Sequence, residues 1–232
     1  YFDNSVSMRT YPFFNNCLNK IIMYPIMSPS SLEVFIEIYG NNETYKSDTQ
    51  IIESPSNSPI LFDINELVKK SGLNDVNLFK VIAQSSTGKI PTRVNHQLIY
   101  GKKDSLSKLY SSINLSLLNE SIYTPPLKTG ITWGQVLVNK SYESRLGICF
   151  MNNSGASDEV SVDFYCNSGL FKSIKHNLNP NNSLILDSKF FKKIKAPNEF
   201  IWYLAKSKRA DLQADSFHYH ISSGNASGEH SF

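Results

Sequence analysis

Side chains that can bind a metal or move protons gather at the end of the chain, in the stretch SFHYHISSGNASGEHSF. His218 and His220 are two residues apart, so in an extended strand they point to one face with Cβ atoms roughly 7 Å apart. Both imidazoles could then reach one divalent metal such as zinc, and a turn at the intervening glycines would bring in His230 as a third ligand. Glu229 would act as a general base or would orient an imidazole. One hypothesis is therefore a metal-dependent enzyme.

The same stretch also has a structural explanation that needs no metal. Phe217, Tyr219 and Ile221 form an apolar face, which leaves His218 and His220 on a polar face that meets water. The imidazoles need hydrogen-bond partners only if that polar face is buried. The sequence leaves both explanations open.

Aromatic residues offer a second kind of chemistry, the recognition of a flat ligand. The faces of aromatic rings stack on the apolar faces of sugars, and neighbouring polar side chains can bond the sugar hydroxyls. The candidates for this role are Trp133, Trp202, Tyr39, Tyr165 and Tyr142, with Asn152 and Asn153 in a nearby turn. Trp202 lies in the apolar run FIWYLA, which favours a core position, so we expect it in the core.

Several other kinds of chemistry have no support in the sequence. The chain has no Gly-rich phosphate loop and no Gly-x-Ser-x-Gly elbow. Its three cysteines, Cys17, Cys149 and Cys166, cannot form a complete set of disulfides within one chain, which favours a reducing, cytoplasmic compartment. Cys149 lies in the apolar stretch GICF, so we expect it to be a buried core residue.

Charge and hydropathy limit the partners. The formal net charge is only +3, and a Lys cluster at residues 189–195 is typical of a solvated face, so nucleic-acid binding is not expected. No run approaches the roughly 18 apolar residues that a membrane-spanning helix needs. The remaining partner classes are a glycan or another protein.

The chain resembles itself. Residues 32–47, LEVFIEIYGNNETYKS, align without a gap on residues 158–173, DEVSVDFYCNSGLFKS. Further along, ILFD at 60–63 matches LILD at 184–187, and LFKVIAQS at 78–85 matches FIWYLAKS at 200–207. Continuing the last register places His96 on His218. Collinear matches of this kind predict an internal duplication.

The pattern inside each copy predicts strands. The stretches EVFIEIY and EVSVDFY alternate with a period of two, and turn-rich spacers such as SPSNSP and NPNN separate the segments. Asp63 stands three residues before Glu66, a spacing that predicts a short helical turn. We therefore expect an all-β chain of two tandem, internally duplicated antiparallel β-sandwich or partly closed barrel domains with short helical turns. Residues 1–110 and 131–232 would be the repeats and 111–130 the linker; one larger sandwich is the alternative.

Three functions fit this reading of the sequence. The first is a non-enzymatic tandem β-sandwich module that recognises a glycan or a protein partner. The second is the metal-dependent enzyme that uses the C-terminal cluster. The third is a structural subunit of a viral or cell-surface assembly. In each case the two copies could pack against each other as a pseudo-dimer within one chain.

Overall fold

The structure is a computed structural model that describes residues 2–3, 6–24, 30–40, 43–53, 58–85, 89–90, 94–114, 116–118, 130–151, 156–197, 199–208 and 211–230. Within this part the chain is all-β, as the alternating pattern predicts, and all sheet pairs are antiparallel. None of the described helices is long and apolar enough to cross a membrane.

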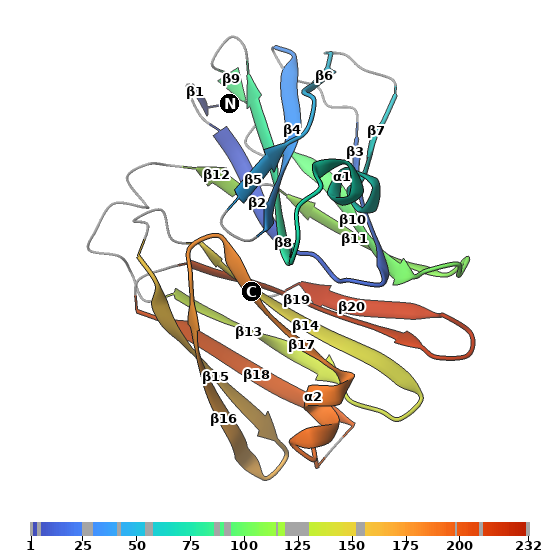
Figure 1. The fold of residues 1–232 in the computed structure, drawn as a ribbon, viewed down its shortest axis with the longest axis vertical. Helices are drawn as coiled ribbons and strands as arrows, with labels where there is room; N and C mark the ends of the chain where they lie inside the picture. Colours follow the sequence, from blue (N-terminus) through green and yellow to red (C-terminus); the bar gives the residue numbers. More distant parts are fainter. Residues whose placement is uncertain are drawn as a thin grey trace.

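The described residues of the first half form two larger sheets and one helix (Figure 1). We call them the β2 sheet, with strand order β12-β2-β8-β4-β5 and β6 added beside β4, and the β3 sheet, with order β11-β10-β3-β7. The elements are β1 (Phe2–Asp3), β2 (Val6–Pro12), β3 (Cys17–Met23), β4 (Leu32–Gly40), β5 (Glu43–Lys46), β6 (Gln50–Ile52), β7 (Ile60–Asp63), α1 (Ile64–Ser71), β8 (Leu78–Ser85), β9 (Lys89–Ile90), β10 (Asn95–Lys102), β11 (Lys108–Asn114) and β12 (Ser116–Leu118). Strands β11 and β12 thus extend the first half to Leu118, into the range expected for the linker.

The second half repeats this arrangement with fewer strands. It contains the β13 sheet, with order β13-β18-β15-β16, and the β14 sheet, with order β17-β14-β19-β20. The elements are β13 (Gly130–Leu137), β14 (Tyr142–Met151), β15 (Asp158–Cys166), β16 (Gly169–Leu178), β17 (Asn182–Asp187), α2 (Ser188–Lys193), β18 (Phe200–Ser207), β19 (Asp211–His220) and β20 (Ala226–His230).

The strand orders of the two halves correspond, except that β12 and β6 have no counterpart among the described strands of the second half. The run β2-β8-β4-β5 matches β13-β18-β15-β16, and β11-β10-β3-β7 matches β20-β19-β14-β17. Strands β4 and β15, which carry the gapless sequence match, hold the same place in this order. Such correspondence is what a duplication would produce, and the duplication itself stays a prediction from the sequence.

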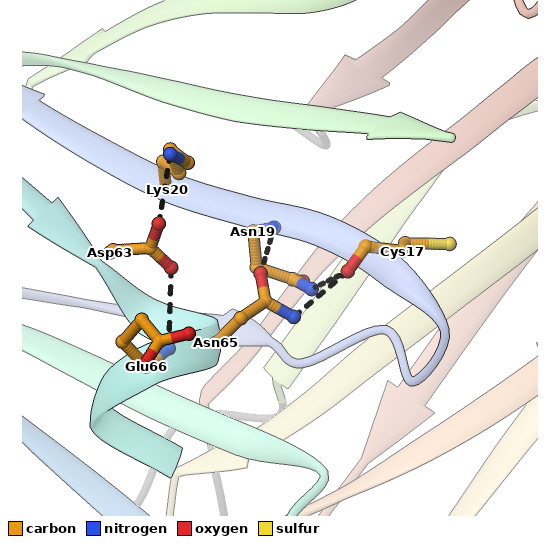
Figure 2. Close-up of polar contacts among 6 residues, drawn as sticks. All are labelled: Cys17, Asn19, Lys20, Asp63, Asn65 and Glu66. Atoms are coloured by element: carbon orange, nitrogen blue, oxygen red, sulfur yellow. Dashed lines mark hydrogen bonds and ion pairs between the residues drawn. The ribbon is translucent and has the colours of Figure 1, made fainter. Parts of the chain in front are cut away.

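Each helix is capped by an aspartate, and the two aspartates hold equivalent positions at the ends of β7 and β17. Asp63 accepts a bond from the backbone N of Glu66 at 3.2 Å and pairs with Lys20 at 2.8 Å (Figure 2). Asp187 caps α2 in the same way, through the backbone N of Lys189 and Phe190. These caps confirm the helical turns that were expected after the matched aspartates.

The first helical turn of each half also ties the helix to the neighbouring strand. Asn65 accepts from the backbone N of Asn19 at 2.7 Å and donates to the carbonyl of Cys17 at 2.9 Å (Figure 2). In the second half Ser188 accepts from the backbone N of Ser144 at 2.7 Å. Asn19 and Ser144 directly precede Lys20 and Arg145, which are the cross-strand neighbours of the two capping aspartates in the sheet register, so the two halves share one local design.

This design corrects one residue match from the sequence. Ile99, Lys20 and Asp63 are neighbours on adjacent strands of the β3 sheet, and Phe217, Arg145 and Asp187 are neighbours on adjacent strands of the β14 sheet. Because Lys20 corresponds to Arg145 and Asp63 to Asp187, Ile99 corresponds to Phe217. Counting one residue further along β10 and β19 puts Tyr100, and not His96, level with His218.

The two halves meet on the outer face of the β14 sheet. Figure 1 shows β19 and β20 next to the first half, with the β13 sheet on the far side. Phe217 and Tyr219 on this face belong to the core of the first half, and the ring of Phe217 lies 6.0 Å from that of Phe14. Gly147 is required here, because a Cβ at this position would lie 2.2 Å from Pro12 Cβ.

Candidate ligand-binding face

Alternation along β18 decides where its tryptophan points. Ile201, Tyr203 and Ala205 are at most 2% exposed and face the core of the second half. Trp202 lies between them on the opposite face and is 44% exposed. The expectation that Trp202 is a core residue was therefore wrong. The run FIWYLA is apolar because both faces of this strand carry large apolar side chains.

Trp133 on β13 reaches the same outer face. Its neighbour Gly134 faces inward, where a Cβ would lie 2.8 Å from Tyr203 Oη, so the ring of Tyr203 occupies the space above the glycine. Trp133 is 45% exposed, and its ring centroid lies 6.3 Å from that of Trp202 with the planes inclined by 37°. The two indole rings form a pair on the surface.

Further apolar side chains extend this pair across the outer face of the β13 sheet. The register places Leu204 opposite Trp133 and Tyr165 opposite Trp202. We define the tryptophan face as the set Ile131, Trp133, Tyr165, Leu170, Trp202 and Leu204. Ile131 and Leu170 on this face are 54% and 55% exposed.

Polar groups border the tryptophan face on the same strands. Asp163 pairs with Leu204 in the sheet register and accepts a hydrogen bond from Ser173 Oγ at 2.6 Å. Gln135 pairs with Trp202, and Lys206 pairs with Ile131. A ligand lying on the rings would meet a carboxylate, an amide and an ammonium group at their edge.

On the corresponding face of the first half, the large apolar side chains are buried. Met8, Phe35 and Ile82 form a row across the β2 sheet, and each is no more than 8% exposed. The ammonium group of Lys46 lies 3.7 Å from the centre of the Phe35 ring. The two halves therefore differ in that the second presents its aromatic side chains to solvent.

The C-terminal histidines lie elsewhere, on the inner face of the β14 sheet at its end. His218 and His220 follow Ser216 on this face, and both are partly buried. The ring of Tyr142 meets them edge to face at 5.8 and 5.1 Å. Burial lowers the pKa of His218 below its ordinary value. His220 Nδ1 accepts from the backbone N of Ser223 at 3.3 Å.

Glu229 has a structural partner. Its Oε2 accepts from the backbone N of Gln135 at 3.1 Å, so the carboxylate satisfies an N–H of β13 on the side away from β18. His230 pairs with Asp215, which lies on the opposite face of β19 from His218. The described side chains include no group of three His, Cys, Asp or Glu residues that could hold a metal ion. The metal site remains a prediction based on the sequence alone.

The residues proposed from the sequence as ligand-binding do not all come together. Trp133 lies on the tryptophan face, whereas Tyr142 lies beside the histidines. Asn152 and Asn153 fall outside the described residues. Cys149 is fully buried, as expected. Trp202 was a candidate that the sequence favoured for the core, and Leu204 was not named; alternation with Ile201 and Tyr203 places both on the face opposite the core, but only the structure shows that this face is open.

Comparisons with known proteins give no family. No family model matches the chain, and no curated protein matches it. Among solved structures, an apo lectin of Pleurotus ostreatus is similar over 99% of this chain and 76% of its own, with 7% identity and a TM-score of 0.25.

Two further similar structures are enzymes. An α-L-rhamnosidase of Streptomyces avermitilis covers 97% of this chain with 9% identity and a TM-score of 0.27, and a β-glucuronidase of Bacteroides uniformis covers 99% with 10% identity and a TM-score of 0.21. The chain spans about a quarter of each enzyme. Values this low assign neither a fold family nor a function, so the functional proposal rests on the geometry alone.

Proposed function

We propose that the protein is a non-enzymatic recognition module that binds a glycan on the tryptophan face. The observation that carries this proposal is the pair of half-exposed indole rings of Trp133 and Trp202, 6.3 Å apart on one open sheet face. Indole rings left in water cost solvation free energy that a stacked ligand recovers.

The surroundings of the rings favour a sugar over a wholly apolar partner. The C–H face of a pyranose is apolar and stacks on the negative face of an aromatic ring. Its hydroxyl groups need donors and acceptors at the ring edge, which Gln135, Asp163 and Lys206 provide. Because the face is open and flat, the ligand would be a stretch of polysaccharide rather than a buried small molecule.

The test is retention by polysaccharides. Affinity electrophoresis in gels that contain soluble polysaccharides, and co-sedimentation with cellulose, chitin and starch, should reveal at least one that retains the protein. Stacking on one ring contributes about 0.5–1.5 kcal/mol. The double variant W133A/W202A should therefore bind about 5- to 150-fold more weakly.

The matched control is L61A, because Leu61 is 56% exposed and lies on β7 of the first half. It should bind like the unmodified protein, and circular dichroism should show the same β signal for all variants. The proposal fails if no polysaccharide retains the protein. Equal retention of W133A/W202A would also exclude this face, and capture of a protein partner alone would replace the glycan.

A further inference from the structure

A cleft of about 700 Å³ lies between the two halves, away from the tryptophan face. The first half contributes Tyr39, Asp75 and Asn77 to its lining, and the second half contributes Asn179, Asn181 and Asn182. We call it the junction cleft. Its volume falls in the range of roughly 300–1,000 Å³ that is usual for small-molecule sites, which form preferentially between domains.

Hydrogen bonds across the junction hold the walls of the cleft in place. Asn77 Nδ2 donates to Asn182 Oδ1, and Ser183 Oγ donates to the carbonyl of Asn77 at 2.6 Å. Lys80 Nζ donates to Asn181 Oδ1 at 2.8 Å. Three bonds between residues about a hundred positions apart make the cleft a preformed feature of the fold.

These bonds use only part of the hydrogen-bonding capacity of the asparagine side chains that line the cleft. An asparagine side chain has two N–H donors and an acceptor oxygen. Among the described residues, Asn181 and Asn182 use their oxygens to hold the walls. Their NH₂ groups therefore keep donors for a ligand, and the exposed Asn179 adds a further amide at the rim.

The charged residues that line the cleft are acidic. Lys80 lies behind the wall, where it is 6% exposed and its ammonium group lies 4.6 Å from the centre of the Tyr39 ring. Glu43 and Asp75 place carboxylates at the rim. An anionic ligand would be repelled by these carboxylates, so a neutral ligand fits better than an anionic one. Because amides and hydroxyls dominate the walls, that ligand must be rich in hydroxyl groups.

We infer that the junction cleft binds a neutral mono- or disaccharide, at a site independent of the tryptophan face. Sugar hydroxyls are both donors and acceptors, so they can bond the amide groups of Asn181 and Asn182 at the same time. Since both halves line the cleft, a bound sugar contacts both.

The test follows the asparagine side-chain amide signals in two-dimensional ¹⁵N–¹H spectra. The probes are glucose, galactose, mannose, N-acetylglucosamine, maltose, lactose and cellobiose, each titrated to about 10 mM, where weak sites begin to fill. At least one sugar should shift the signals of Asn77, Asn181 and Asn182 saturably. The same shifts should occur in W133A/W202A, which separates this site from the tryptophan face.

Filling the cleft should weaken sugar binding. N179F places a ring in the cleft at an exposed position, and we expect affinity to fall at least tenfold. The matched control N225F changes an exposed asparagine in the turn between β19 and β20 and should leave the titration unchanged. Absence of saturable shifts with all seven sugars, an affinity that N179F leaves unchanged, or shifts lost in W133A/W202A would each overturn the inference.

Discussion

At the scale of single residues, Asp215 stands out because its carboxyl group is buried at the junction. It is 2% exposed, and its Oδ2 has no hydrogen-bond partner among the described residues. Burial raises its pKa from an ordinary 3.8 to about 6, although the nearby Arg9 guanidinium acts in the opposite direction. The folded protein therefore holds this proton at pH values where the unfolded chain has released it.

We expect the substitution D215N to change how stability depends on pH. Between pH 3.8 and about 6 the folded state binds more protons than the unfolded state, so the stability contributed by Asp215 falls as pH rises through this window. The loss amounts to about 3 kcal/mol, because each unit of pKa shift corresponds to 1.36 kcal/mol. Urea unfolding of both proteins below and above the window measures the difference.

His96 also makes the stability of the protein depend on pH, but its contribution grows as the pH rises, whereas that of Asp215 falls. It is fully buried, hydrogen-bonded to Tyr11, and burial lowers its pKa from 6.5 to about 3. Its contribution is present above pH 6.5 and is lost as the pH falls. Because it is common to both proteins, the comparison with D215N cancels it. Parallel pH profiles for the two proteins would contradict the assignment to Asp215.

The limits of the sequence are clearest at Trp202. Alternation places Ile201 and Tyr203 on one face of a strand, but an apolar residue on the other face can be covered by a further layer or left in solvent. In the first half Phe35 and Ile82 on the corresponding face are covered, whereas Trp202 is open. Nothing local in FIWYLA distinguishes the two cases, so the exposure of Trp202 required the three-dimensional structure.

At the scale of elements, the two helix caps allow a matched pair of substitutions. D187A removes bonds to the backbone N of Lys189 and Phe190, and we expect it to cost about 1 kcal/mol of unfolding free energy. D63A should cost up to about 1 kcal/mol more, since Asp63 also pairs with the partly exposed Lys20. Denaturant titration checks both, and a smaller loss for D63A than for D187A would contradict this view.

Elements were predictable where a pattern was strong. The stretches at 78–85 and 200–207 coincide with β8 and β18, and the turn after Asp63 is α1. The match between β10 and β19 was less accurate, because residues 86–94 connect β8 to β10 whereas only residues 208–210 connect β18 to β19, and an alignment continued through connections of unequal length loses the register. The register between β10 and β19 can be recovered only from the cross-strand partners of the two equivalent residues: Ile99 lies opposite Lys20, and Phe217 lies opposite Arg145.

At the scale of the whole molecule, the junction depends on a close approach of Gly147 to Pro12. G147A would place a Cβ 2.2 Å from the proline ring, and we expect a loss of about 1–3 kcal/mol in unfolding free energy. The control is G101A, whose Cβ would meet only the flexible side chain of Lys108 and should cost less. Equal stability of G147A and the unmodified protein would show that the halves do not pack as described.

The sequence indicated two similar halves but not how they join. Phe217 and Tyr219 read as one apolar face of a strand, and the alternation could not show that this face packs on Phe14 and Tyr100 of the other half. The pseudo-dimer therefore stays a prediction from the sequence. Contacts between residues about two hundred positions apart, such as Thr10 with Gln213, leave no local pattern to read.

The most direct measurement uses the protein's own fluorescence. The chain has two tryptophans, and both lie on the tryptophan face, so its tryptophan emission reports on that face alone. When a polysaccharide that retains the protein is titrated in, sugar rings that stack on Trp133 and Trp202 should exclude water and shift the emission saturably to shorter wavelength. Emission that stays unchanged at concentrations where the polysaccharide binds would place binding elsewhere and contradict the account.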